Sequence, residues 1–172
     1  MKYFPAMLGL FIILFSCTEK ELNTTVNIAE LSDLVLKPAT YRTDKYDHFN
    51  AEVVINQTKD TLRFCECSQL INKITILIHD GGGMNYNEIK IEITNHVFIS
   101  SFAHTADVIS LEYKANPIQQ TLKLNRLNPK QGESLTGEVK FKGIFINGYL
   151  QNPLGNVDIS GKFTCKVIKE SN

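Results

Sequence analysis

The chain has 172 residues, of which 43% are hydrophobic, and its 18 basic side chains balance its 18 acidic ones. That composition supports one domain with a hydrophobic core and excludes a chain that is disordered throughout. The neutral balance, together with the absence of tryptophan and of basic runs interleaved with aromatic residues, argues against a nucleic-acid partner.

The first sixteen residues have the order of charge and hydrophobicity that is typical of a secretory signal peptide. Lys2 supplies a short basic start, and the run 4–15 that follows is almost wholly apolar. A run of about a dozen residues is too short to cross a hydrocarbon core of roughly 30 Å. We therefore predict a signal peptide over residues 1–16.

The sequence Leu14-Phe15-Ser16-Cys17 resembles the lipobox of bacterial lipoproteins. The resemblance implies cleavage before Cys17 and acyl chains on its sulfur and its new amino group, which would attach the protein to a membrane. Each buried methylene contributes about 0.8 kcal/mol, so several chains on one residue make a stable anchor. The alternative is an ordinary signal peptide in which Cys17 is incidental. The predicted location is the outer membrane, on either its periplasmic or its cell-surface face.

A polar, charged stretch follows Cys17, and residues 17–44 are expected to form a flexible lipidated tether. Within it, residues 29–36 are compatible with one or two helical turns or with a short strand, which Pro38 ends. The predicted organisation is thus a signal peptide over 1–16, a tether over 17–44 and a folded β-sandwich domain over 45–172.

From residue 46 onward, apolar and polar residues alternate as in a sheet with one face toward water. The pattern is clearest where Ile89, Ile91 and Ile93 alternate with charged residues. Nine strands are predicted, over residues 49–56, 61–66, 73–79, 88–94, 96–102, 109–114, 121–127, 135–142 and 157–167. Because no amphipathic helix separates them, we predict an all-β domain, an antiparallel sandwich or barrel-like fold of about eight or nine strands.

The last third of the chain resembles the C-terminal end of small outer-membrane β-sandwich lipoproteins of Bacteroidota-type bacteria. The stretches that begin at Leu122, Leu135 and Val157 follow that family's order of a strand, a glycine-containing strand, a loop and a Gly-x-Phe strand. Gly161-Lys-Phe163 matches the last of these, whereas Val139 stands where the family usually has phenylalanine. The resemblance implies a lipid-anchored β-sandwich and no particular activity.

The stretch from His79 to Gly83, His-Asp-Gly-Gly-Gly, resembles the oxyanion loop of some α/β-hydrolases. Asp80 interrupts that motif, the Gly-x-Ser-x-Gly nucleophile elbow is absent, and no Gly-Lys-Ser/Thr phosphate loop follows. Three consecutive glycines instead suit a turn between two strands. We interpret the stretch as a turn, and we predict that the protein is not an enzyme.

If every connection reverses the chain direction, alternate loops gather at one end of the domain. Loops 57–59, 80–87, 103–107 and 128–134 would then meet. Their side chains include His79, Asp80, Tyr86, His104 and Asp107. Two histidines with two aspartates could ligate a metal ion, and the tyrosine could help to hold a sugar or a peptide. The simpler interpretation is a set of solvated loop side chains.

Three cysteines remain besides the one in the lipobox: Cys65, Cys67 and Cys165. They allow at most one disulfide, and in an oxidising compartment Cys165 could pair with either of the other two. Cys165 also lies on the apolar face of the last strand, where a buried free thiol is ordinary, and we favour that interpretation. A zinc site of three cysteines and one histidine is a further alternative.

The sequence therefore predicts a lipid-anchored envelope protein that acts as a non-catalytic binding module for a protein, a peptide or a glycan. The alternatives are a metal-dependent or hydrolytic enzyme that uses the end-loop histidines and aspartates, and a structural envelope component. No cofactor and no resident metal are predicted. Asp60-Thr61-Leu62 resembles an O-glycosylation sequon of Bacteroidota-type secreted proteins, which makes Thr61 a candidate modification site.

Overall fold

The computed structural model describes residues 22–31, 37–43, 46–56, 60–82, 85–106, 111–147 and 152–169. These residues form strands, bridges and turns, which confirms the all-β prediction. Nothing helical in these ranges is long and apolar enough to cross a membrane. The predicted signal peptide, Cys17 and Asp107 lie outside the described residues.

The strands follow one another as hairpins along most of the chain. In order they are β1 (Asn27–Ile28), β2 (Lys37–Thr43), β3 (Tyr46–Phe49), β4 (Ala51–Ile55), β5 (Thr61–Leu62), β6 (Phe64–Leu70), β7 (Lys73–His79), β8 (Asn85–Thr94), β9 (Val97–Ala106), β10 (Leu111–Leu124), β11 (Ser134–Asn147) and β12 (Pro153–Lys169). Strands β2 and β3 form a small sheet of their own, and the other strands belong to one large sheet.

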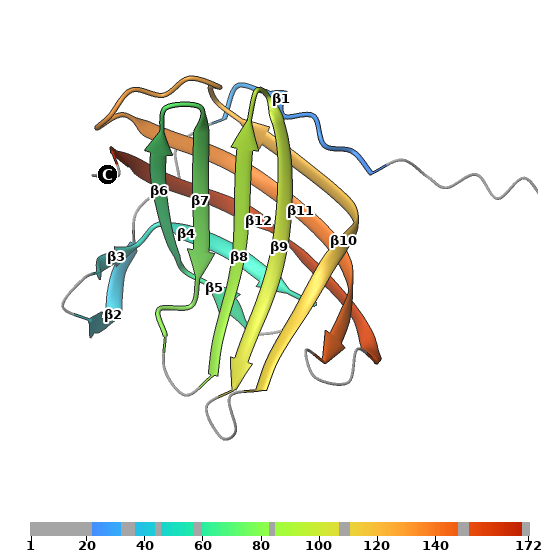
Figure 1. Ribbon diagram of the computed structural model, residues 1–172. Coiled ribbons are helices and arrows are strands. Elements are labelled where there is room, and N and C mark those ends of the chain that lie inside the picture. Colours follow the sequence, from blue (N-terminus) through green and yellow to red (C-terminus); the bar gives the residue numbers. More distant parts are fainter. Residues whose placement is uncertain are drawn as a thin grey trace, which may run out of the picture.

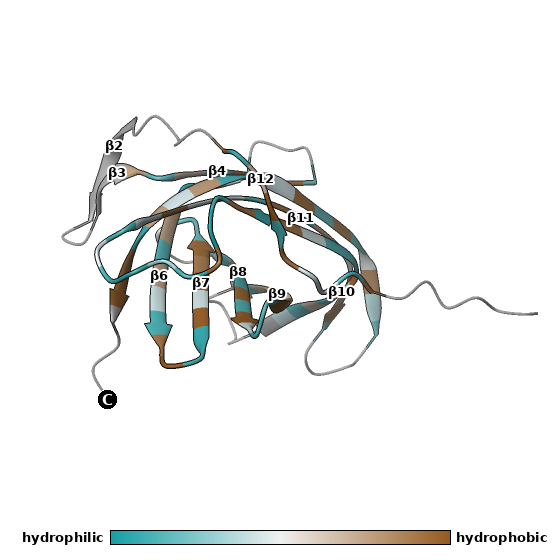
Figure 2. Ribbon diagram, turned by 90° about the horizontal axis from the view of Figure 1, so that it is seen from above, coloured by the Kyte–Doolittle hydropathy of each residue, from teal (hydrophilic) through white to brown (hydrophobic). Residues whose placement is uncertain are grey.

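The large sheet closes on itself. Antiparallel pairs run from β6 through β7, β8, β9, β10 and β11 to β12, and a short parallel pairing of β12 with β6 completes the ring. In Figure 1, strands β6 to β9 lie in front of the long diagonals of β11 and β12. Figure 2 shows the same two layers from above, with β4 beside β12. This mainly antiparallel, barrel-like sandwich agrees with the predicted fold class.

The period-two alternation of the sequence places the core between the two layers. In β8, Ile89, Ile91 and Ile93 are buried, whereas the residues between them are partly exposed. Phe98 from one layer and Phe141 and Phe163 from the other are fully buried as well. Burying a side chain of this size contributes about 1.5–3 kcal/mol, so this shared interior holds the layers together.

Two predicted strands are in fact one. The segments 109–114 and 121–127 were expected to be separate strands, but Leu111–Leu124 is continuous as β10, with an irregularity in its pairing to β11 between Pro117 and Gln119. A bulge lets a strand accommodate proline, which has no N–H to donate to the ladder. The polar stretch around Pro117 therefore has the composition of a turn but does not reverse the chain.

The folded domain begins earlier than predicted. Residues 22–31, expected in the tether, lie along the sheet, where the Phe98 N–H donates to the Thr24 carbonyl over 2.7 Å and the Val26 N–H donates to the His96 carbonyl over 3.1 Å. Val26 is buried, and β1 pairs in parallel with β10. The expected boundary at residue 45 is therefore too late, because this segment completes hydrogen bonds that β10 leaves open on β9.

The ring is incomplete at two corners. At the first corner, β9 and β10 pair only between Phe102–Ala106 and Leu111–Ala115, and then they diverge. The buried side chain of Gln120 fills the gap: its Oε1 accepts from the Ser100 N–H over 3.1 Å and from the Ser100 hydroxyl over 2.5 Å. Its Nε2 donates to the Phe98 carbonyl over 3.4 Å. We call this corner the β9–β10 seam.

At the second corner, β6 and β12 pair in parallel only where Cys67–Gln69 meets Val167–Lys169. Just before that pairing, the side chain of Asn50 makes the hydrogen bonds to β6 that the backbone of a neighbouring strand would otherwise make. Its Oδ1 accepts from the Cys65 N–H over 2.6 Å, and its Nδ2 donates to the Cys65 carbonyl over 2.7 Å. The carbonyl of Asn50 in turn accepts from the Thr164 N–H over 2.8 Å. We call this corner the β6–β12 seam.

Candidate functional site: a cavity at one end and a buried thiol cluster

The connections between strands divide between the two ends of the ring. Strands β7, β9 and β11 end, and strands β8, β10 and β12 begin, at the end of the ring where β4 also finishes, which we call the mouth (Figure 1). The turns at 71–72 and 95–96 and the segment 125–133 lie at the opposite end. The prediction that loop 128–134 joins the loops of the mouth is wrong, because the continuity of β10 removes one reversal of the chain.

A cavity of about 530 Å³ opens at the mouth between the two layers. Its volume lies within the roughly 300–1,000 Å³ that small-molecule sites occupy. The described residues that line it are Ile55, Asn56, Asp60, Asn85, Asn87, Phe102, His104, Phe145, Leu154, Gly155, Asn156 and Val157. The lining thus combines aromatic and aliphatic side chains with four amides, one carboxylate and one imidazole.

Aromatic rings form one part of the cavity wall. The ring centroid of Phe145 lies 5.9 Å from that of Phe102 and 6.4 Å from that of His104. Tyr113 stacks on Phe145 with centroids 5.5 Å apart and contacts His104 at 5.8 Å. These separations are typical of favourable aromatic pairs, which contribute about 0.5–1.5 kcal/mol beyond their burial. The packing holds the rings that line the cavity in fixed positions.

A hydrogen-bonded chain orients the polar groups beside this wall. Asn87 Nδ2 donates to Asp80 Oδ2 over 3.0 Å, so Asn87 Oδ1 is left to accept from His104 Nδ1 over 2.8 Å. In the neutral imidazole this assigns the proton to Nδ1 and leaves Nε2 as an acceptor. His104 therefore contributes a positioned acceptor to a cavity whose amides supply donors.

The structure separates the predicted cluster of histidines and aspartates. His79 pairs with Glu88, whereas His104 pairs with Asn87. Residues 87 and 88 are consecutive in β8, so their side chains point to opposite faces of the sheet. His104 accordingly lines the cavity, and His79 lies on the outer face. The described residues do not assemble the predicted two-His, two-Asp metal site, and Asp107 lies outside them.

On the outer face, His79 behaves as a packed aromatic side chain and is only 3% exposed. Its ring centroid lies 5.7 Å from that of Phe64 and 5.8 Å from that of Tyr86. Its Nδ1 accepts from the Gly81 N–H over 3.1 Å, and its Nε2 lies 3.6 Å from Glu66 Oε1. The predicted contribution of Tyr86 to a ligand site therefore does not extend to the cavity, because Tyr86 packs on the other face.

The described part of the glycine stretch, residues 80–82, follows β7 without regular secondary structure, which agrees with the loop interpretation. Gly81 and Gly82 have φ angles of 99° and 89°, a region that side-chain-bearing residues rarely adopt. Asp80 holds the turn, since Oδ1 accepts from the Gly82 N–H over 3.3 Å and Oδ2 accepts from the Asn87 N–H over 3.0 Å. The carboxylate of Asp80 thus supports the mouth from outside the cavity.

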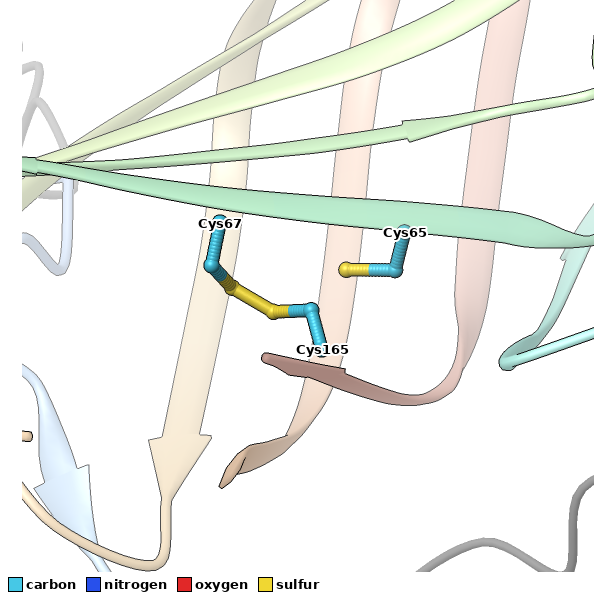
Figure 3. A group of neighbouring side chains, drawn as sticks. All are labelled: Cys65, Cys67 and Cys165. Carbon is cyan, nitrogen blue, oxygen red and sulfur yellow. A yellow bond between two sulfur atoms is a disulfide. The ribbon is translucent and has the colours of Figure 1, made fainter. Parts of the chain in front are cut away.

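The three cysteines of the folded domain gather at the β6–β12 seam. Cys67 and Cys165 form a disulfide with their Cα atoms 5.7 Å apart, and Cys65 is a buried free thiol beside them (Figure 3). The sulfur atoms of all three lie within 4.8 Å of one another, and no His, Asp or Glu of the described residues joins the group. The favoured prediction of a free thiol at Cys165 is wrong, because the parallel seam brings β12 against β6.

The surroundings of Cys65 favour its protonated form. Burial raises the pKa of the Cys65 thiol well above its usual range, and the nearby charge of Glu66 raises it further. Because the thiolate is the nucleophilic form, the thiol is a weak nucleophile at neutral pH.

Thr61 lies at the start of β5, where it pairs with Val54 and is partly buried. It lies next to Asp60, which lines the cavity. Modification of Thr61 stays a prediction.

Most of the residues that line the cavity were not predicted, although the sequence carries a signal for some of them. Asn85 and Asn87 continue the inward positions that Ile89, Ile91 and Ile93 occupy in the same strand. A polar amide at an inward position near the end of an alternating strand indicates that the apolar core gives way there to a polar cavity. Asn156 has no comparable signal, because its position depends on the pairing of β11 with β12.

Comparison of the chain with protein-family models, with curated proteins and with solved structures finds no match. The family resemblance that the lipobox and the C-terminal strands suggest therefore stays a prediction.

Proposed function

We propose that this protein is a lipid-anchored outer-membrane lipoprotein that binds a glycan, without catalysing a reaction, in the cavity at its mouth. The observation that carries the proposal is the cavity itself, which is about 530 Å³ in volume and lined by aromatic rings and amides together. A sugar ring has the matching chemistry, with a flat face of C–H groups and an edge of hydroxyls.

The composition of the lining favours a neutral sugar. Phe102 and Phe145 supply apolar surface, and aromatic rings with a fixed orientation are common in sites for ligands that are partly apolar. Amides from both layers, among them Asn85 and Asn156, each offer donors and an acceptor to hydroxyl groups. No Lys or Arg occurs among the described lining residues, so an anionic ligand would find no opposite charge there.

The same lining supports binding rather than catalysis. Hydrolysis of a glycosidic bond normally uses a pair of carboxylates, and Asp60 is the only one among the described residues that line the cavity. No Ser, Thr, Cys or Lys that could act as an alternative nucleophile is among those described lining residues. The rival proposal, a metal-dependent enzyme, relied on His79 acting together with His104. Their placement on opposite faces of the sheet removes the geometric basis for that cooperation.

A panel of neutral and acidic glycans, titrated against the purified protein, tests the proposed function. We expect a neutral glycan to bind and Phe145→Leu to weaken its binding about tenfold, because leucine keeps apolar volume but loses the aromatic face, while Phe145→Tyr retains binding. His104→Ala should weaken binding similarly. His96→Asn, in the turn at the opposite end, is the matched control. Binding that is unaffected by Phe145→Leu and His104→Ala would contradict this site, and binding restricted to acidic glycans would contradict the ligand class.

Metal analysis of the same preparation tests the enzymatic rival. One tightly bound equivalent of metal that is lost in the His79→Ala, His104→Ala double variant would favour that rival over the proposal.

The anchor at Cys17 is tested separately. Intact-mass measurement of protein extracted from outer membranes should show loss of residues 1–16 and added acyl chains. Cys17→Ala should release the protein from the membrane, because no acyl chains would then hold it. An unmodified amino terminus at Met1 would contradict the anchor while leaving the cavity proposal intact.

A further inference from the structure

We propose that the β6–β12 seam has two alternative disulfides, Cys67–Cys165 and Cys65–Cys165, and that Cys65 is the thiol that converts the first into the second. The proposal is independent of the function proposed for the mouth.

The positions of the three sulfurs carry the proposal. Cys65 and Cys67 are two residues apart in β6, so both side chains point to the same, inner face. Figure 3 shows Cys65 beside the Cys67–Cys165 bond, and all three sulfurs lie within 4.8 Å of one another. A free thiol this close to a disulfide needs only a small movement to reach it.

The direction of the two strands at the seam makes Cys65 a second accessible partner for Cys165. Val167 lies opposite Cys67, with the two strands parallel. Extending this register two residues toward the start of both strands brings Cys165 level with Cys65, with Asn50 inserted between the two backbones there. Asn50 holds the backbone of Cys65 in place through both its N–H and its carbonyl. The second disulfide therefore requires no change in the order or direction of the strands.

The exchange balances without an added oxidant or reductant. Cys65 loses its proton, and its thiolate attacks the Sγ of Cys165. A Cys65–Cys165 bond forms as the Cys67–Cys165 bond breaks, and the Cys67 sulfur leaves as a thiolate that takes up a proton. One disulfide and one thiol are present before and after the exchange, so the seam moves its covalent link two residues along β6 while the ring stays closed.

The surroundings of Cys65 set the pace of this exchange. Burial raises the pKa of the thiol, with a further rise from Glu66 on its own strand. The groups that face Cys65 from neighbouring elements are uncharged: Ile78 pairs with it from β7, and Asn50 bonds its backbone. Exchange should accordingly be slow at neutral pH and faster as the pH rises toward the pKa of the thiol.

Peptide-resolved thiol labelling of the full chain tests the proposal. The protein is quenched in acid, unfolded, labelled with N-ethylmaleimide and digested without reduction, so that Cys17 and the three seam cysteines are read separately. In Cys67→Ser we expect a Cys65–Cys165 disulfide in most molecules. Cys65→Ser should keep Cys67–Cys165, whereas Cys165→Ser should leave Cys65 and Cys67 both labelled. A Cys67→Ser protein in which Cys65 and Cys165 are both labelled would overturn the proposal.

The unaltered protein supplies a second measurement in case Cys67→Ser does not accumulate. It is incubated in its folded state at roughly pH 9 for increasing times before the quench, because thiol–disulfide exchange follows the thiolate fraction. We expect the label to appear on Cys67 as it declines on Cys65. Label that remains confined to Cys65 at every time would then reject the exchange.

Discussion

The β6–β12 and β9–β10 seams are both places where neighbouring strands part, yet only the first is closed by a covalent bond. At the second, the Gln120 side chain and the N-terminal segment close the gap through hydrogen bonds alone. The difference follows from their separation along the chain. Strands β9 and β10 are consecutive, whereas Cys67 and Cys165 are 98 residues apart. Bringing distant segments together costs more chain entropy than closing a short loop. The ring is therefore linked covalently where its closure is entropically most costly.

The parallel pairing at the β6–β12 seam is also short. It covers only Cys67–Gln69 against Val167–Lys169, whereas β9 continues on its other edge in full register with β8. Few ladder hydrogen bonds oppose separation of β6 from β12. The disulfide and the hydrogen bonds of Asn50 therefore supply a larger share of the interactions that hold this seam together. At the β9–β10 seam, the N-terminal segment and Gln120 complete an edge that is already held by β8.

Breaking the covalent link should have the largest effect. We expect Cys165→Ser to lower the free energy of unfolding by about 2–5 kcal/mol, because it removes the constraint that a long closed loop places on the unfolded chain. Urea denaturation of the oxidised protein measures this change. Because Cys165 is common to both proposed disulfides, Cys67→Ser should cost less than Cys165→Ser. Equal losses in the two variants would mean that no second disulfide compensates.

Removing the amide at the other seam should have a smaller effect. We expect Gln120→Leu to lower the free energy of unfolding by about 1–3 kcal/mol, since the buried N–H and hydroxyl of Ser100 lose their acceptor. Gln119→Leu, at an exposed neighbouring position, is the matched control. Hydrogen exchange of the Ser100 amide should accelerate in the first variant alone. A stability loss without faster exchange at Ser100 would place the effect elsewhere in the core.

The two seams also explain what the sequence could and could not predict. Alternation is a local property, so it revealed β8 and most of β11 and β12. The parallel pairing of Cys67 with Val167 is not local, and nothing in either strand's pattern selects it. Without that pairing, the proximity of Cys165 to Cys67 and Cys65 could not be inferred, and a free core thiol was the simpler prediction for a cysteine on an apolar face.

The mouth shows the same limit. His104 was predicted to lie near the loops of one end, and it does line the cavity there. His79 was expected beside it, but the face on which each residue lies depends on register at the strand ends, which the turn at Gly81 and Gly82 obscures. The loop at 128–134 was misplaced because Pro117 marks a bulge rather than a turn. Treating β10 as two strands added one reversal of the chain, and this assigned every later connection to the wrong end of the ring.

A third variant compares the contribution of Asn50 at the β6–β12 seam with that of Gln120 at the β9–β10 seam. Asn50→Ala removes both hydrogen bonds to the Cys65 backbone, but Asn50 is only half-buried, so water can satisfy part of what is lost. We expect a loss of about 1 kcal/mol in the oxidised protein. Asn116→Ala, at an exposed strand position, provides the control. A loss larger than that of Gln120→Leu would show that the disulfide leaves the β6–β12 seam dependent on this side chain.

The smallest effect is expected far from both seams, in the regular β7–β8 ladder. Glu92 accepts from Lys73 over 2.5 Å and from Lys90 over 3.0 Å, and these bonds lower the pKa of its carboxyl group. All three side chains are more than one third exposed, so solvent screening limits their contribution to well under 1 kcal/mol.

Since the folded-state pKa of Glu92 is lowered, that contribution is present above the unfolded-state pKa and is lost as the pH falls through the folded-state pKa. Glu92→Gln should therefore change the free energy of unfolding slightly at pH 7, by about 0.5 kcal/mol or less, and not at all at low pH. A loss as large as that of Gln120→Leu would mean that a surface ion pair contributes as much as the buried amide of the β9–β10 seam, and that the corners are not where the ring is weakest.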